Sequence, residues 1–149
     1  MQAVQDAIDQ RVTIAAPLER VWTALTDAEQ LKSWFSTDGC KVDLRVGGEI
    51  HFHWAESIGR ATILALEPPS RFVWSWVPGM LEDPDLSLDQ QPQTTVEFVL
   101  EATADGQTVV SSRETGFAAM SAADRDRAFS MNVEGWGFFF DSLKKHLEV

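Results

Sequence analysis

The most regular pattern in the chain lies at residues 121–147, SAADRDRAFSMNVEGWGFFFDSLKKHL. Ser121, followed by Asp124 three residues later, is a variant of the capping box that starts helices. Large apolar residues then recur at intervals of three or four: Phe129, Val133, Trp136, Phe140, Leu143 and Leu147. This spacing predicts a long amphipathic helix with one apolar face.

The residues before this helix alternate apolar and polar side chains, which is typical of antiparallel strands that bury one face. We expect strands over 8–14, 40–46, 50–54, 61–67, 72–76, 96–100 and 109–114. One short helix is predicted to start at Pro17 and a second to run from Asp27 to Phe35. Because the long helix is the only element large enough to cover the apolar face of the sheet, the sequence predicts an α+β fold.

The alternation also predicts which strand residues face that helix. They are Ile50, Phe52, Trp54, Phe72, Trp74, Trp76, Val96, Phe98, Leu100, Val110, Ser112 and Glu114. The chain has six Trp, nine Phe and no Tyr. Rings of this size either fill a core or hold sheet and helix apart around a cavity for a small molecule. Gly135 and Gly137 each cost the helix about 1 kcal/mol relative to Ala, which indicates a close backbone approach or space kept open for a ligand.

Length and composition limit the possible functions. The 149 residues predict a single domain over 1–149. A net charge of −11 argues against binding to nucleic acid or to anionic membranes. No run approaches the ~18 apolar residues of a membrane helix, and the first residues do not resemble a secretory signal, so we expect a cytoplasmic protein. The single cysteine, Cys40, cannot form an internal disulfide.

Few residues suggest catalysis. Glu114, if it faces inward, would place a carboxyl group in apolar surroundings, where it can act as a general acid or base or anchor a polar ligand group. His51 and His53 share the outer strand face with Glu49, but no third metal ligand is evident, so no metal is predicted. Cys40 has no histidine at a suitable spacing to activate it. No phosphate-binding loop or nucleophile elbow occurs, and we predict no cofactor.

The segment from Pro78 to Pro92 has no clear periodicity. It carries three prolines and the acidic residues Glu82, Asp83, Asp85 and Asp89. Long loops of this kind are uncommon in compact proteins unless they are functional or disordered. The segment is therefore either a flexible connection without a role or a rim over a binding site.

Four stretches, in this order, resemble the AHSA family of the START/polyketide-cyclase (SRPBCC) superfamily. They are APLERVWTALTD at 16–27 with Leu31 and Trp34-Phe35, DLRVGG at 43–48, EPPSRFVWSW at 67–76, and Gly135-Trp136 with Leu143 and Leu147. The resemblance implies a helix-grip fold, in which a curved antiparallel sheet wraps around the C-terminal helix. It also implies an internal cavity, because family members bind lipids, sterols, polyketides or other apolar molecules there. The family's eponymous chaperone activator has a further N-terminal domain, for which this chain has no room.

We therefore predict that the chain binds an apolar or aromatic small molecule between sheet and helix. The predicted ligand contacts are Phe52, Trp54, Trp74, Trp76, Phe98, Ser112, Glu114, Val133, Trp136 and Phe140. One alternative is a cyclase, hydratase or hydrolase that uses Glu114 as acid or base. Another is a chaperone-related protein-interaction domain that uses the acidic surface and the long loop. Edge strands and exposed aromatic residues are also compatible with a homodimer.

Overall fold

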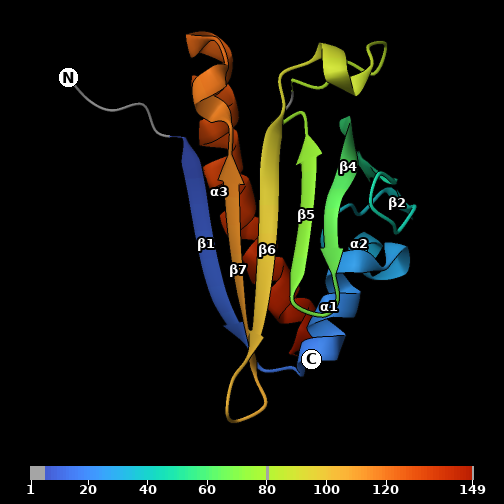
Figure 1. The fold of residues 1–149 in the computed structure, drawn as a ribbon, viewed down its shortest axis with the longest axis vertical. Helices are drawn as coiled ribbons and strands as arrows, with labels where there is room; N and C mark the ends of the chain where they lie inside the picture. Colours follow the sequence, from blue (N-terminus) through green and yellow to red (C-terminus); the bar gives the residue numbers. More distant parts are fainter. Residues whose placement is uncertain (1–5, 80, 149) are drawn as a thin grey trace, which may run out of the picture.

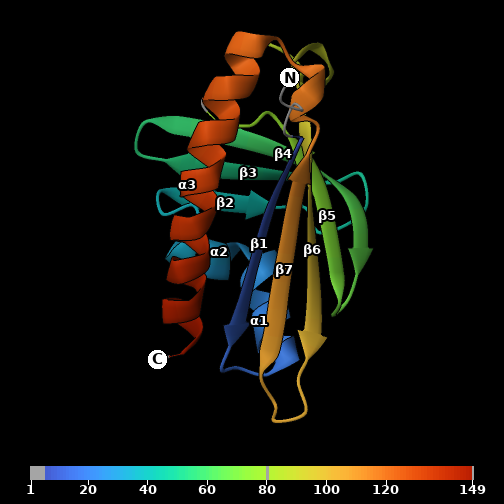
Figure 2. The same ribbon diagram turned by 90° about the vertical axis from the view of Figure 1, so that its left-hand side faces the viewer.

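The computed structural model describes residues 6–79 and 81–148, and there the chain forms one antiparallel sheet with a long helix on one face (Figures 1 and 2). The sheet has seven strands in the order β1-β7-β6-β5-β4-β3-β2. The strands are β1 (Ala7–Ile14), β2 (Gly39–Val42), β3 (Glu49–Trp54), β4 (Ser57–Glu67), β5 (Arg71–Trp76), β6 (Thr94–Ala102) and β7 (Thr108–Thr115). The helices are α1 (Leu18–Thr26), α2 (Ala28–Trp34) and α3 (Ala122–Leu147), with short 3-10 turns η1 (Leu88–Gln90) and η2 (Phe117–Ala119). The predicted α+β helix-grip architecture is confirmed.

Local hydrogen bonds explain where two of the helices start. The Ser121 side chain accepts a hydrogen bond from the Asp124 backbone N–H at 3.3 Å, and Asp27 accepts one from Gln30 N–H at 3.1 Å. Each bond satisfies one of the backbone donors that a first helical turn leaves free. Pro17 lies one position before α1, as its N-cap, rather than inside the first turn.

The strand register confirms the predicted inward face. Val96 pairs with Glu114, and Phe98 pairs with Ser112, across β6 and β7, and all four side chains are buried. Of the other residues predicted to face inward, only Trp54 is partly exposed; it packs against the edge of the core. A side-chain period of two is therefore sufficient to assign the faces of this sheet.

Two predicted features differ in the structure. The strand expected over 40–46 ends at Val42, because the chain turns at Asp43–Gly48, and Leu44 and Val46 are exposed. The buried face of α3 also differs from the predicted apolar face. Val133 is 40% exposed, and Asn132 lies on the side that faces the sheet. The buried residues of α3 are Ala128, Trp136, Phe140, Leu143 and Leu147.

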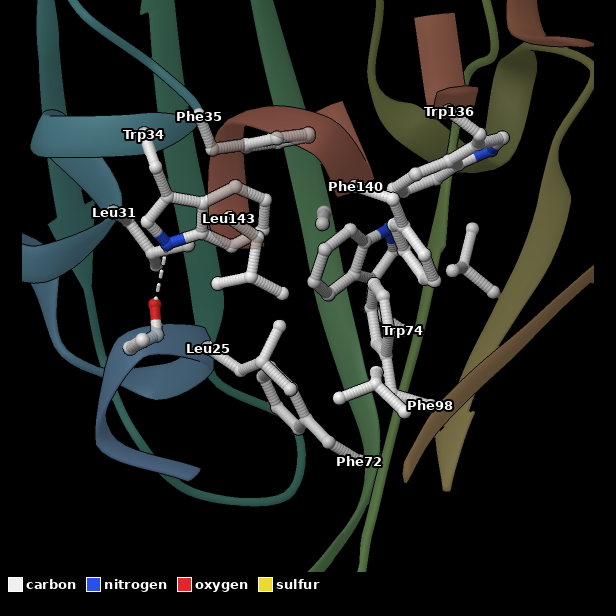
Figure 3. Packing of buried hydrophobic residues seen from close by; sticks show 14 of the residues in the cluster. Leu25, Leu31, Trp34, Phe35, Phe72, Trp74, Phe98, Trp136, Phe140 and Leu143 are labelled. Atoms are coloured by element: carbon white, nitrogen blue, oxygen red, sulfur yellow. Dashed lines mark hydrogen bonds between the residues drawn. The ribbon is translucent and has the colours of Figure 1, made fainter. Parts of the chain in front are cut away.

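Aromatic rings fill most of the space between sheet and α3 (Figure 3). Phe35, just after α2, lies at the centre of these rings. Its ring centroid is 5.0 Å from Phe52, 5.9 Å from Trp136 and 4.4 Å from Phe139. The adjacent Trp34 is held by its indole N–H, which donates to the Ala24 carbonyl at 2.7 Å (dashed in Figure 3). The helices α1 and α2 thus close the end of the core beside the C-terminus of α3 (Figure 2).

The segment between β5 and β6 lies at the opposite end of the molecule, beside the start of α3 (Figure 1). Arg60 of β4 binds this segment through two hydrogen bonds to Glu82, both 3.1 Å, and a 2.6 Å hydrogen bond to the Leu86 carbonyl. The hydrogen bonds to Glu82 raise the pKa of the Arg60 guanidinium. Gly79 approaches α3 so closely that a Cβ there would lie 3.3 Å from Ala128 Cα, and its φ of +62° favours glycine.

Candidate functional site

An apolar cavity of about 200 Å³ lies between the β3–β4 hairpin, the end of β5 and the middle of α3. We call it the α3 cavity. Its lining residues are Trp54, Ile58, Gly59, Trp76, Val77, Gly79, Met131, Asn132, Gly135 and Phe139. No lining residue is charged, and Asn132 is the only one with a carboxamide. This composition, mostly apolar with few polar groups, is typical of small-molecule sites.

Two glycines shape this cavity. At Gly135, an added Cβ would meet nothing within 4 Å outside the helix itself, so the helix leaves open space on its cavity side. At Gly59, an added Cβ would lie 3.1 Å from the ring of Trp54, so glycine gives this ring room to pack closely against β4. Ile58 and Met131 are 38% and 37% exposed and form the rim of the opening.

Behind one wall of the cavity lies Glu114, which is 1% exposed. Trp136 Nε1 donates to its Oε1 at 2.7 Å, and Trp76 Nε1 donates to its Oε2 at 2.9 Å. Asn132 Nδ2 donates to both oxygens at 2.9 and 3.1 Å, and the Thr94 hydroxyl donates to Oε2. We call these five residues the Glu114 network. It joins β5, β6, β7 and α3 through a buried carboxylate that accepts five hydrogen bonds from four side chains.

The structure separates the ten predicted ligand contacts into groups. Trp54 and Trp76 line the α3 cavity, and Glu114 and Trp136 lie directly behind its wall. The others do not line it: Phe52, Trp74, Phe98, Ser112 and Phe140 are buried, and Val133 is exposed. The inward placement of Val133 was wrong, because α3 turns the neighbouring Asn132 toward Glu114 instead.

The sequence did not single out Asn132, Phe139 or the lining residues Val77 and Gly79. A polar residue on an amphipathic helix is normally assigned to solvent, and the buried partner of Asn132 lies 18 residues earlier in the chain. The one available signal was Gly135, whose position in the helix interior indicated open space.

Other candidate chemistry is weak. His51 Nε2 lies 3.0 Å from Glu49 Oε1 on the outer face, and within 6–79 and 81–148 no group of three metal-ligand side chains occurs. Burial raises the pKa of the Cys40 thiol, which opposes nucleophilic use of this residue. Among the described residues, no helix is both long and apolar enough to cross a bilayer.

Comparison with known proteins places this geometry in a family. The family model for activator of Hsp90 ATPase homolog 1-like proteins (AHSA1) matches residues 15–148. The chain belongs to the AHSA1 family. The match includes α1, α2, the sheet from β2 onward and all of α3, so both the cavity and the Glu114 network lie within the AHSA1 region. No curated protein sequence matched the chain.

Solved structures share the AHSA1 fold. Protein MLL2253 from Mesorhizobium loti is 24% identical, with a TM-score of 0.76 over 95% of this chain and 96% of that one. The Aha1 dimer from Colwellia psychrerythraea is 23% identical, with a TM-score of 0.77 over 97% and 98%. CalU16 from Micromonospora echinospora is 26% identical, with a TM-score of 0.69 over 95% and 75%. These likenesses support the helix-grip fold.

Proposed function

We propose that this AHSA1 family member binds an apolar or aromatic small molecule in the α3 cavity. The observation that carries the proposal is Gly135, which leaves open space at the centre of a helix and lines an apolar cavity. An interior glycine costs a helix roughly 1 kcal/mol relative to alanine. This cost is understandable where the absence of a side chain leaves room for a ligand. The composition of the chain favours the cytoplasm as the place where it acts.

The size of the cavity limits the ligand. An apolar cavity of about 150 Å³ is enough to hold benzene. The α3 cavity, at about 200 Å³, therefore fits a molecule with one or two rings. A sterol or an extended polyketide would fit only if the segment after β5 moved away from Ala128.

Gly135→Leu provides a direct test. The leucine side chain would fill the cavity, so we expect this variant to lose binding of 2-naphthylmethanol, a neutral two-ring probe, in calorimetric titrations. Its thermal stability should stay equal or rise, because leucine is the better helix former. Gly137→Leu is the matched control: Gly137 is exposed and does not line the cavity, so this variant should gain helix propensity and retain binding.

Equal binding by both variants would show that the probe does not occupy the α3 cavity. Failure of the wild-type protein to bind any probe of one or two rings, whatever its charge, would contradict the proposed function itself.

A second candidate, which is compatible with the first, is self-association through α3. Phe138 is 70% exposed, and Met131 lies seven residues earlier on the same side of the helix. The Colwellia relative is described as a dimer, which supports a homodimer here. We expect Phe138→Ser to shift a dimer toward monomer in analytical ultracentrifugation. A wild-type protein that sediments as a monomer at all concentrations would rule this candidate out.

A further inference from the structure

Glu114 is a buried carboxylate that forms no ion pair with any cationic side chain in the part of the chain that the structure describes. Its five hydrogen bonds come from neutral groups: two indoles, one hydroxyl and one carboxamide. None of the ion pairs within residues 6–79 and 81–148 involves it. Hydrogen bonds from neutral donors hold a carboxylate in place but leave its net charge uncompensated. Because indole and carboxamide nitrogens can only donate, both Glu114 oxygens act as acceptors, as they do in an ionised carboxylate with its negative charge.

This charge lies one side chain away from the α3 cavity. Trp76 and Asn132 both line the cavity, and both donate a hydrogen bond to Glu114. The remaining lining residues carry no charge. Because Glu114 itself is 1% exposed, its charge is screened by salt much less than a charge on the surface.

The walls of the cavity, like the Glu114 carboxylate, favour a positively charged ligand. Trp54, Trp76 and Phe139 present aromatic rings, whose faces attract cations. Asn132 uses its amide nitrogen for Glu114, and no hydrogen bond among the described residues engages its Oδ1. That carbonyl oxygen is thus available to accept a bond from a ligand N–H. All three features favour a positive group and oppose a negative one.

We propose that the α3 cavity selects a compact lipophilic amine in its cationic form, with one or two rings, and discriminates against carboxylates of the same size. This inference rests on the proposed function and adds the charge of the ligand to it. The amine would lie against the aromatic walls, with its N–H groups directed toward Asn132 Oδ1 and the Glu114 charge behind it.

A charge series on the wild-type protein tests the proposal. The probes are 2-naphthylmethylamine, 2-naphthylmethanol and 2-naphthoate, which have the same ring system and carry a positive, zero and negative charge near neutral pH. We expect calorimetric dissociation constants about tenfold lower for the amine than for the alcohol, and weaker binding still for the carboxylate. Binding of the alcohol with no preference for the amine would overturn this inference and leave the proposed function intact. Loss of binding for all three would overturn both.

The net charge of −11 also attracts cations, so a salt control is needed. Attraction by exposed charges decreases as salt is added, whereas the effect of a buried charge is screened much less. We expect the ratio of amine to alcohol affinity to persist at high salt; its disappearance there would assign the preference to the surface and overturn the proposal. In folded Glu114→Gln protein, which lacks the carboxylate charge, the ratio of amine to alcohol affinity should fall toward one. An unchanged ratio in that variant would contradict the role of Glu114.

Discussion

Replacing Trp136 with alanine is expected to lower the free energy of unfolding by about 3–5 kcal/mol, the usual cost of truncating a buried aromatic side chain. Trp136 is 3% exposed, and its ring contacts Phe35, Trp76, Phe98 and Phe140. The substitution also removes the 2.7 Å hydrogen bond to Glu114 and leaves a void next to the α3 cavity. Urea denaturation measures the loss.

Two further variants identify which interactions of Trp136 account for this loss of stability. Trp136→Phe keeps most of the packing and removes the indole N–H, so it should lose less than Trp136→Ala. Val133→Ala, on the exposed side of the same helix, should cost less than about 1 kcal/mol. A loss for Val133→Ala as large as that for Trp136→Ala would mean that Val133 is buried against the sheet, as the spacing of the apolar residues predicts. It would contradict the orientation of α3 described above.

The second large effect is expected at Glu114. Glu114→Gln retains the size of the side chain but replaces one acceptor oxygen with an NH₂ group that faces other donors. A buried donor left without a partner costs about 1–3 kcal/mol, and both Trp76 Nε1 and the Thr94 hydroxyl donate to the same Glu114 oxygen. We therefore expect a loss of about 2–4 kcal/mol in the free energy of unfolding.

A matched substitution separates this effect from the change in charge. Glu97→Gln on β6 makes the same chemical change at a partly exposed position, where the side chain forms an ion pair with Arg71. Exposed ion pairs contribute about 0–1 kcal/mol, so this variant should be close to wild type in stability. Equal losses in the two variants would mean that the Glu114 network does not hold α3 against the sheet.

The sequence was most informative about the sheet. The inward positions of Phe52, Trp74, Phe98 and Glu114 follow from alternation alone, because a strand has only two faces and one of them must be buried. The end of β2 was less predictable. Leu44 and Val46 continue the alternation, yet they are exposed where the chain turns back toward β3. An edge strand has a partner on one side only, so its length depends on its neighbour as well as on its own sequence.

The sequence by itself determined the class of fold, the long C-terminal helix, the buried aromatic face and the inward position of Glu114. These follow from local periodicity, since residues close in sequence share one element and its geometry. The tertiary structure alone decided that Asn132 rather than Val133 faces the sheet, that Phe35 packs against Phe139 in the core, and that Gly135 leaves open space in the α3 cavity. A buried carboxylate on β7 makes a polar helix residue favourable inside, and only folding brings these groups within hydrogen-bonding distance.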